Sequence, residues 1–253
     1  MHNVQSLIQD LKNSGVDPSG TLLVHSSVKA VGKCERRGDT IIDALIEYMR
    51  DGLLILPTHT WDKINAEYNI YDPETEPSCV GVLTNLFLKR PGVIRSLHPT
   101  HSVAAIGKNA AVFVSGEEKT RTPCPRDGVY GKLYDLNAQI LLLGCGFSSY
   151  TYIHCIEEWM DIPDRLNTVT QELFVKTADG LIPCPQHRHH CSHTNDISKN
   201  YVKMEKAFIK TGAAIYCRIG DAKSILCDAK KTADLTIRCL QETPNLFADK
   251  SEY

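Results

Sequence analysis

Three segments place histidines and hydroxyl side chains next to short apolar runs. Residues 93–107 carry an arginine, two histidines and several hydroxyls before an apolar stretch, and residues 25–27 and 58–60 each follow one. Polar, titratable groups beside a buried element cost free energy unless a ligand or a hydrogen-bond network satisfies them. Because ligands of open α/β sheets bind beyond the carboxyl ends of the strands, we expect the three segments to form one site.

A fourth segment carries the residue types of a general base. Glycines and hydroxyls at 144–151 follow an apolar run and lead into a predicted helix that contains His154 and Glu157. Their i, i+3 spacing puts both on one helix face. Histidine accepts a proton near neutral pH, and a nearby carboxylate can stabilise the imidazolium. His154 and Glu157 are therefore the catalytic candidates, although Glu157 also suits an ordinary helix position.

Cys145 in the same segment is an alternative nucleophile. It lies between two glycines, but Gly-Cys-Gly is not the Gly-x-Ser-x-Gly elbow of hydrolases. No cysteine pair has Cys-x-x-Cys spacing, so we expect the ten cysteines to be reduced thiols that act mostly as small apolar side chains.

Apolar periodicity predicts alternating helices and strands. The expected helices are 3–14, 39–48 with Asp39 or Thr40 as its cap, 80–89, 151–160, 197–210 and 229–240. The expected strands are 21–25, 52–56, 102–106, 139–143 and 215–219, with a hairpin over 173–182 and a long loop over 68–78. This pattern predicts an α/β fold, in which helices flank a central mostly parallel or mixed sheet with a β-hairpin addition, in a single domain over 1–253.

Composition narrows the function classes. The chain has 253 residues, 42% of them hydrophobic, and a net charge of -2, which argues against bulk electrostatic binding of nucleic acid. It has no apolar run of about 18 residues that would cross a membrane. The first residues lack the basic-then-apolar pattern of a signal peptide, so we expect a cytoplasmic protein.

A histidine-rich stretch at 183–193 leaves three interpretations open. His189, Cys191 and His193 alternate, so an extended strand would put them on one face, where nitrogen and sulfur ligands suit zinc. The stretch can instead line a substrate cleft, or it can be surface without a role. We expect the cleft and no resident metal. A zinc hydrolase or lyase built on His59, His98, His101 and this stretch is the alternative.

In their order and spacing, these segments resemble the aminoglycoside N(3)-acetyltransferase family. The similarity extends from about residue 3 to about residue 242. The segments that carry it are 24–27, 56–61, 91–99 with Ser102, 141–144, 154–157, 161–163, Gly212, 220–222 and the closing helix.

The resemblance implies an enzyme that transfers an acetyl group from acetyl-CoA to an amino group, in the type case the 3-amino group of an aminoglycoside. The amine attacks the thioester directly, and His154 is the implied general base. The implied cofactor contacts are His25, Ser26, Ser27, Val28, Arg95, Ser96, Ser102, Ser149 and Thr151. The implied substrate contacts are Thr58, His59, Trp61, Asp62, His189 and His190.

Among these residues, arginine suits a phosphate, and Ser149 or Thr151 could bind the thioester oxygen. The expected partner is a small-molecule amine, without nucleic acid or membrane, and the protein is a monomer or homodimer.

One region departs from the family pattern. Members acting on aminoglycosides often carry acidic residues near 183–193, because a polycationic sugar favours carboxylates, whereas this chain has histidines there. The identity of the amine therefore stays open, and Asp62, Glu67 and Asp72 form a second candidate amine site. A different small amine as acceptor, and a CoA-binding protein without catalysis, are the remaining alternatives.

Overall fold

The computed structural model describes residues 1–194 and 196–248. The α-helices are α1 Val4–Asn13, α2 Gly38–Tyr48, α3 Val82–Phe87, α4 Ala110–Val114, α5 Val129–Asp135, α6 Tyr152–Trp159, α7 Glu205–Thr211 and α8 Ala229–Glu242. The strands are β1 Thr21–Ser26, β2 Leu53–Pro57, β3 Ile70–Tyr71, β4 Ile94–Arg95, β5 Val103–Gly107, β6 Gln139–Leu143, β7 Phe174–Thr177, β8 Gly180–Pro183, β9 Ala214–Ile219 and β10 Ala222–Asp228.

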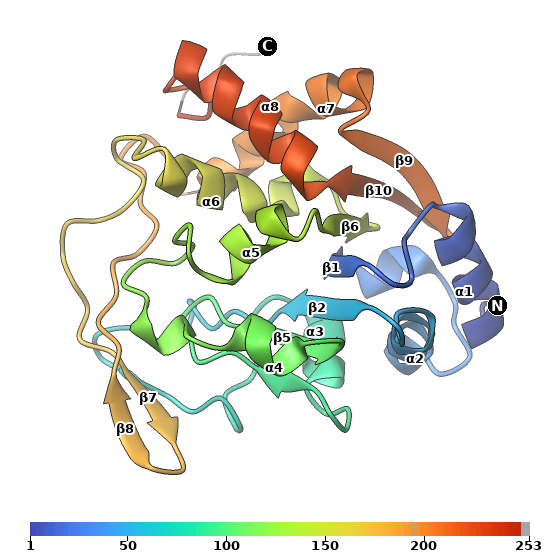
Figure 1. Ribbon diagram of the computed structural model, residues 1–253, viewed down its shortest axis with the longest axis horizontal. Coiled ribbons are helices and arrows are strands. Elements are labelled where there is room, and N and C mark those ends of the chain that lie inside the picture. Colours follow the sequence, from blue (N-terminus) through green and yellow to red (C-terminus); the bar gives the residue numbers. More distant parts are fainter. Residues whose placement is uncertain (195, 249–253) are drawn as a thin grey trace.

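The main sheet has seven strands in the order β4-β5-β2-β1-β6-β10-β9 (Figure 1). Its three central strands, β2, β1 and β6, are parallel, and the strands outside them pair antiparallel. The predicted α/β fold with a mixed sheet is confirmed. Because the three parallel strands end at the same edge, the polar residues that follow them are brought together there.

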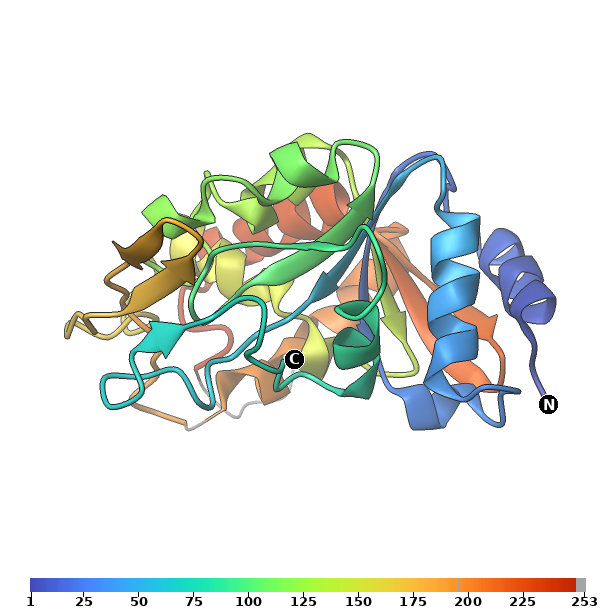
Figure 2. The same cartoon turned by 90° about the horizontal axis from the view of Figure 1, so that it is seen from below.

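Helices cover both faces of this sheet (Figure 2), and an apolar layer lies between each face and its helices. Leu22 and Val24 of β1 pack into the core under α1, α2 and α3, while Leu23 between them packs into the core under α5, α6 and α8. All three side chains are fully buried. This is why the central strands are nearly continuous apolar runs rather than alternating ones.

A second, three-stranded sheet of β3, β7 and β8 projects from the end of the molecule opposite α1 (Figures 1 and 2). The predicted hairpin forms β7 and β8. The prediction of an uninterrupted loop over 68–78 is wrong, because Ile70 and Tyr71 pair in parallel with β7. Tyr71 is completely buried and anchors a small core of its own beside Val175, which explains why an otherwise polar loop forms two strand residues.

Several predicted boundaries also differ from the structure. Helix α2 begins at Gly38 after Arg37, and Thr40 Oγ1 accepts a bond from the Arg36 amide, so neither Asp39 nor Thr40 is the cap. The predicted helix over 197–210 is a 3₁₀ helix, Ile197–Met204, followed by α7. The prediction omitted β10, which follows β9 after only Gly220 and Asp221; Gly220 has a φ of 59°, which lets the chain reverse so tightly.

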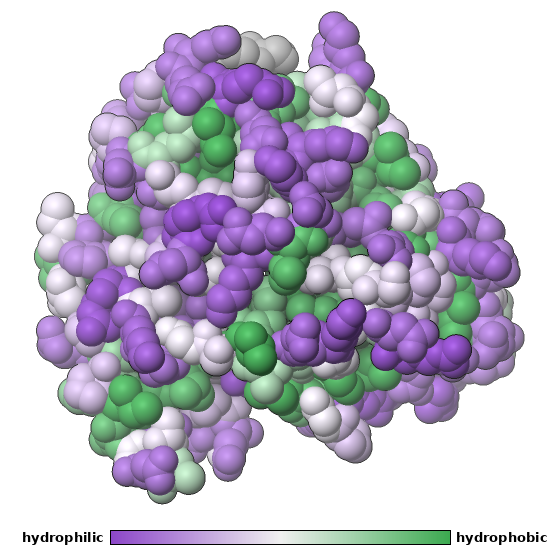
Figure 3. All heavy atoms as spheres, viewed as in Figure 1, coloured by the Kyte–Doolittle hydropathy of each residue, from purple (hydrophilic) through white to green (hydrophobic). Residues whose placement is uncertain are grey.

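The hydropathy of the surface agrees with what the sequence composition predicts. The face in Figure 3 is mostly hydrophilic, with small apolar patches between polar side chains. Within the described residues, no helix is both long and apolar enough to cross a membrane. All ten cysteines lie in the described part of the chain and are free thiols.

Candidate active site

A cavity of about 480 Å³ opens at the carboxyl ends of the parallel strands. His25 and Ser26 reach it from β1, His59 and Trp61 follow β2, and the segment after β6 contributes a larger group. That group consists of Cys145, Ser148, Ser149, Thr151 and His154. Residues 188–191 close the cavity together with Thr194, Asp196, Ile197 and Ser198. Residues 93–107 contribute His101 to the cavity wall, so all three segments that we expected to converge meet here.

His154 lies in the first turns of α6 and is held by an ordered chain of contacts. Its Nδ1 is 2.6 Å from the hydroxyl of Tyr201, and that hydroxyl donates to Glu157 Oε2 at 2.6 Å. Glu157 Oε1 accepts from Arg165 Nε at 2.5 Å. Glu157 is thus linked to His154, as its i, i+3 position indicates, but through Tyr201 rather than directly.

This chain of contacts decides the tautomer of His154. Burial raises the pKa of Glu157, but protonating that carboxylate would leave the buried Arg165 guanidinium without a counter-charge, so the pair is ionised. An ionised carboxylate only accepts, so the Tyr201 proton points to Glu157 and the Tyr201 oxygen accepts the Nδ1 proton of His154. The Nε2 atom of His154 then carries a lone pair, which a general base requires.

The surroundings keep His154 unprotonated. Its ring stacks on that of His189, with centroids 4.5 Å apart and planes at 16°. Burial, followed by the charge of His189, holds the pKa of His154 well below the usual 6.5. At neutral pH the imidazole is therefore free to accept a proton.

The remaining buried histidines are neutral and mostly serve the structure. His59 Nε2 is 2.7 Å from the Tyr130 hydroxyl, and His98 uses Nε2 on the Thr122 carbonyl oxygen and Nδ1 on two backbone amides. Burial lowers the pKa of His98 to about 4 and that of His59 well below its ordinary value. Because both ring nitrogens of His98 are engaged inside the protein, His98 offers no free ligand to a zinc site with His59 and His101.

Arg95, Ser96 and Ser102, unlike the neighbouring His101, do not line the cavity. The Arg95 guanidinium donates to the carbonyl oxygens of Thr58, Pro73 and Glu76 and to the hydroxyls of Thr58 and Ser102. Ser96 and Ser102 are completely buried, and Ser102 donates to the Thr58 carbonyl. None of these side chains is among the described residues lining the cavity, so their hydrogen bonds hold the loop after β2 in place.

Some of the other predicted site residues line the cavity and some do not. His25, Ser26, Ser149, Thr151, His59, Trp61, His189 and His190 line the cavity; Ser27, Val28, Thr58 and Asp62 do not. Asp62 and Glu67 lie on an exposed loop, and Asp72 pairs with Lys176. The acidic loop therefore lies outside the cavity.

The histidine-rich segment is not the extended strand predicted from its alternation. Isolated bridges pair Gln186 with Gln171 and His189 with Leu166, and the rest of the segment lies in irregular structure held by Arg165 and Asn167. His193 is exposed, whereas His189 points inward. The three alternating residues therefore do not share one face.

Cys145 lines the cavity, but it is a poor nucleophile. Burial raises the pKa of its thiol to about 11, so the reactive thiolate is scarce at neutral pH.

Tyr201 and Arg165 are the site residues that sequence reasoning missed. Tyr201 lies 47 residues from His154 in the chain, within the 3₁₀ helix, and Arg165 lies eight residues after Glu157 in a loop. No spacing in the sequence joins them to α6, because the contacts depend on how the loop after α6 and the chain after β8 fold back.

Comparison with known proteins identifies the family. The family model for aminoglycoside 3-N-acetyltransferases matches residues 23–241. Aminoglycoside N(3)-acetyltransferase IV of Salmonella sp is 32% identical over 252 residues, covering 97% of this chain and 90% of that protein. Aminoglycoside N(3)-acetyltransferase III of Acinetobacter baumannii is 24% identical, covering 89% of each chain.

Solved structures agree in fold. The apoenzyme of aminoglycoside acetyltransferase AAC(3)-IVa superposes with a TM-score of 0.82 at 24% identity, over 97% of this chain and 91% of that one. AAC-IIIb in binary complex with CoASH gives 0.84 at 22% identity, over 95% and 97%. The chain belongs to the aminoglycoside 3-N-acetyltransferase family. It is an acyltransferase whose co-substrate is acetyl-CoA, as the sequence predicted.

Proposed function

We propose that this protein transfers the acetyl group of acetyl-CoA to the 3-amino group of an aminoglycoside, with His154 as general base. One observation carries the proposal: Tyr201 and Glu157 occupy the Nδ1 side of His154, which leaves a basic Nε2 for the cavity. The relatives named for this activity on aminoglycosides support the substrate class.

The base acts on the nitrogen of the acceptor. An ammonium group has no lone pair, so the acceptor first loses one proton to solvent, and His154 Nε2 removes a second proton from the nitrogen as the neutral amine attacks the thioester carbonyl carbon. The new C–N bond replaces the C–S bond, and the CoA sulfur leaves as a thiolate. His154 then delivers its proton to that thiolate or to solvent. Acetyl-CoA supplies the activated acetyl group, and the cavity holds both substrates beside the base.

The cavity wall fits a cofactor on the β1 side. The Nε2 atom of His25 is buried there without a hydrogen-bond partner among the described residues, which indicates a place for a ligand acceptor or donor. Ser26, Ser149 and Thr151 present hydroxyls to the same space. Ser149 and Thr151 lie within five residues of His154, so their hydroxyls are the candidates to stabilise negative charge on the thioester oxygen.

The charge of the cavity sets limits on the acceptor. Of the described lining residues, Asp196 alone is acidic, and Arg188 and several histidines line the cavity as well. The Arg188 guanidinium is already bound to the carbonyl oxygens of Trp61 and Ile64. A polycationic acceptor therefore finds fewer carboxylates here than its charge favours. A less cationic small amine is the second candidate on this observation.

A thiol-release assay tests both candidates. Purified protein with acetyl-CoA is challenged with gentamicin, apramycin and a panel of simple monoamines. We expect CoA release with at least one aminoglycoside, and product NMR should place the acetyl group on the 3-amino nitrogen. Release with monoamines alone would assign a different acceptor. Binding of acetyl-CoA without any release would contradict the catalytic proposal and indicate a CoA-binding protein.

A further inference from the structure

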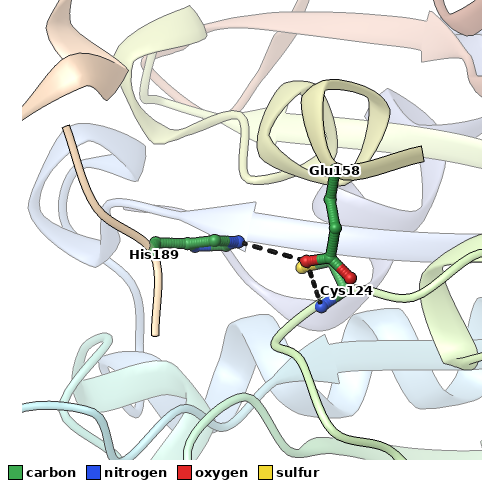
Figure 4. A group of neighbouring side chains, drawn as sticks. All are labelled: Cys124, Glu158 and His189. Atoms are coloured by element: carbon green, nitrogen blue, oxygen red, sulfur yellow. Dashed lines mark hydrogen bonds and ion pairs between the residues drawn. The ribbon is translucent and has the colours of Figure 1, made fainter. Parts of the chain in front are cut away.

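Three potential metal ligands of different chemistry meet behind His154. Cys124 comes from the loop before α5, Glu158 from α6, and His189 from the segment after β8 (Figure 4). One ligand atom of each, a sulfur, an oxygen and a nitrogen, lies within 4.8 Å of the others. Within residues 1–194 and 196–248, no other histidine, cysteine or acidic group meets this criterion.

The nitrogen of this cluster has no hydrogen-bond partner. His189 Nε2 is buried and makes no hydrogen bond to any described residue. It points at Glu158 Oε2 across 3.6 Å (Figure 4), which is too long for a hydrogen bond. In a tetrahedral zinc site with bonds of about 2.1 Å, two such ligands lie about 3.4 Å apart. The observed spacing suits an ion between the two side chains.

The carboxylate is held ready by neighbouring groups. Glu158 Oε1 accepts from the Thr122 hydroxyl, and Oε2 accepts from the Cys124 amide at 3.0 Å. Cys124 is 1% exposed, and the Glu158 side chain is 7% exposed. Metal ligands are typically fixed by such outer hydrogen bonds, which reduce the entropy that binding removes. The cluster is therefore preorganised and largely buried.

We propose that Cys124, Glu158 and His189 bind a zinc ion, with a water molecule as the fourth ligand. Thiolate, imidazole and carboxylate together form a ligand set that zinc accepts and that magnesium and calcium do not favour. On binding, the Cys124 thiol gives up its proton to solvent as the Zn–S bond forms. The ion would fix the His189 ring against His154.

Metal content of the untagged protein tests the site. Protein grown with added zinc and passed through a desalting column should retain zinc stoichiometrically in mass spectrometry of the metal. Cys124→Ser and His189→Asn should each retain little of it. Cys191→Ser and His190→Asn are the matched controls, because these neighbours of His189 lie outside the cluster, and both should keep the ion.

Cobalt gives a second readout on the unaltered chain. Protein stripped with a chelator and titrated with Co²⁺ alone should show a thiolate-to-cobalt charge-transfer band, which Cys124→Ser should lose. Absence of both the stoichiometric zinc and this band in the wild type would overturn the proposal and favour a protonated His189 paired with Glu158. Neither readout uses acetyl transfer, so failure of the proposed function would leave this result unaffected.

Discussion

Two segments of this chain carry similar side chains and use them in opposite ways. Residues 93–107 and residues 144–157 each supply histidine and serine next to a strand of the same sheet. In the first segment, Arg95 and Ser102 bond to backbone carbonyl oxygens and to each other, while His101 borders the cavity. The second presents Ser149, Thr151 and His154 to the cavity. Residue type therefore does not decide function; what decides it is whether the protein itself satisfies the group.

The largest effect should follow from removing the base. His154→Ala should lower turnover by roughly a hundredfold or more while acetyl-CoA still binds, because proton transfer is lost but the cofactor side is intact. Steady-state thiol release and calorimetric titration of acetyl-CoA measure the two quantities. Unchanged turnover would contradict the assignment of His154.

In the other segment, the expected effect is on stability. Arg95→Met keeps the approximate size of the side chain but removes the hydrogen bonds that Arg95 donates to Thr58 and Glu76. The free energy of unfolding should fall by about 2–3 kcal/mol. Denaturant unfolding measures this loss, and the KM for acetyl-CoA should stay near that of the wild type. A large rise in KM at normal stability would instead make Arg95 a cofactor contact and remove the contrast between the segments.

Losing the Tyr201 hydroxyl should have an intermediate effect. Tyr201→Phe frees Nδ1 of His154, so the tautomer is no longer fixed, and turnover should fall about tenfold with little change in KM. Tyr152→Phe is the matched control, because its buried hydroxyl has no partner among the described residues and should be dispensable. Equal losses in the two variants would point to packing rather than to tautomer control.

The stability of the fold should decrease at acid pH because buried histidines are neutral in the folded protein. His25 and His98 have pKa values near 4 because burial disfavours their charged forms, while their unfolded pKa is near 6.5. Below pH 6.5 the unfolded chain binds more protons, so stability falls as pH drops through that window, by about 1 kcal/mol per histidine between pH 7 and about pH 5.5. Urea unfolding at a series of pH values measures the slope, and His98→Asn should flatten it.

The smallest expected effect is a kinetic difference between the alanine variants of two serines, Ser149 and Ser96. Ser149→Ala should raise the KM for acetyl-CoA a few-fold or slow turnover modestly, because its hydroxyl borders the cavity. Ser96→Ala should leave both constants alone, because Ser96 is completely buried and accepts the Val103 amide. Initial rates at varied acetyl-CoA distinguish them, and the reverse ranking would show that the segments have been assigned the wrong way round.

Much of the fold could be predicted because its signals are local. The apolar runs at β1, β2 and β6 and the spacing in α1 are set by neighbouring residues, and they predicted the mixed sheet and its flanking helices correctly. Strand β3 and the 3₁₀ helix at 197–204 were missed or mistaken. Their conformations depend on partners far away in the chain, Val175 for Tyr71 and His154 for Tyr201.

The sequence alone determined the α/β fold, the family, the acetyl-CoA co-substrate and His154 as the candidate base, because these depend on local patterns in a given order. Only the tertiary structure decided which polar groups are free. It turned Arg95 and Ser102 inward and brought Tyr201 between His154 and Glu157. It also placed His189 Nε2 beside Cys124 and Glu158. A hydrogen bond between distant residues has no period or spacing in a chain, so it appears only when the chain is folded.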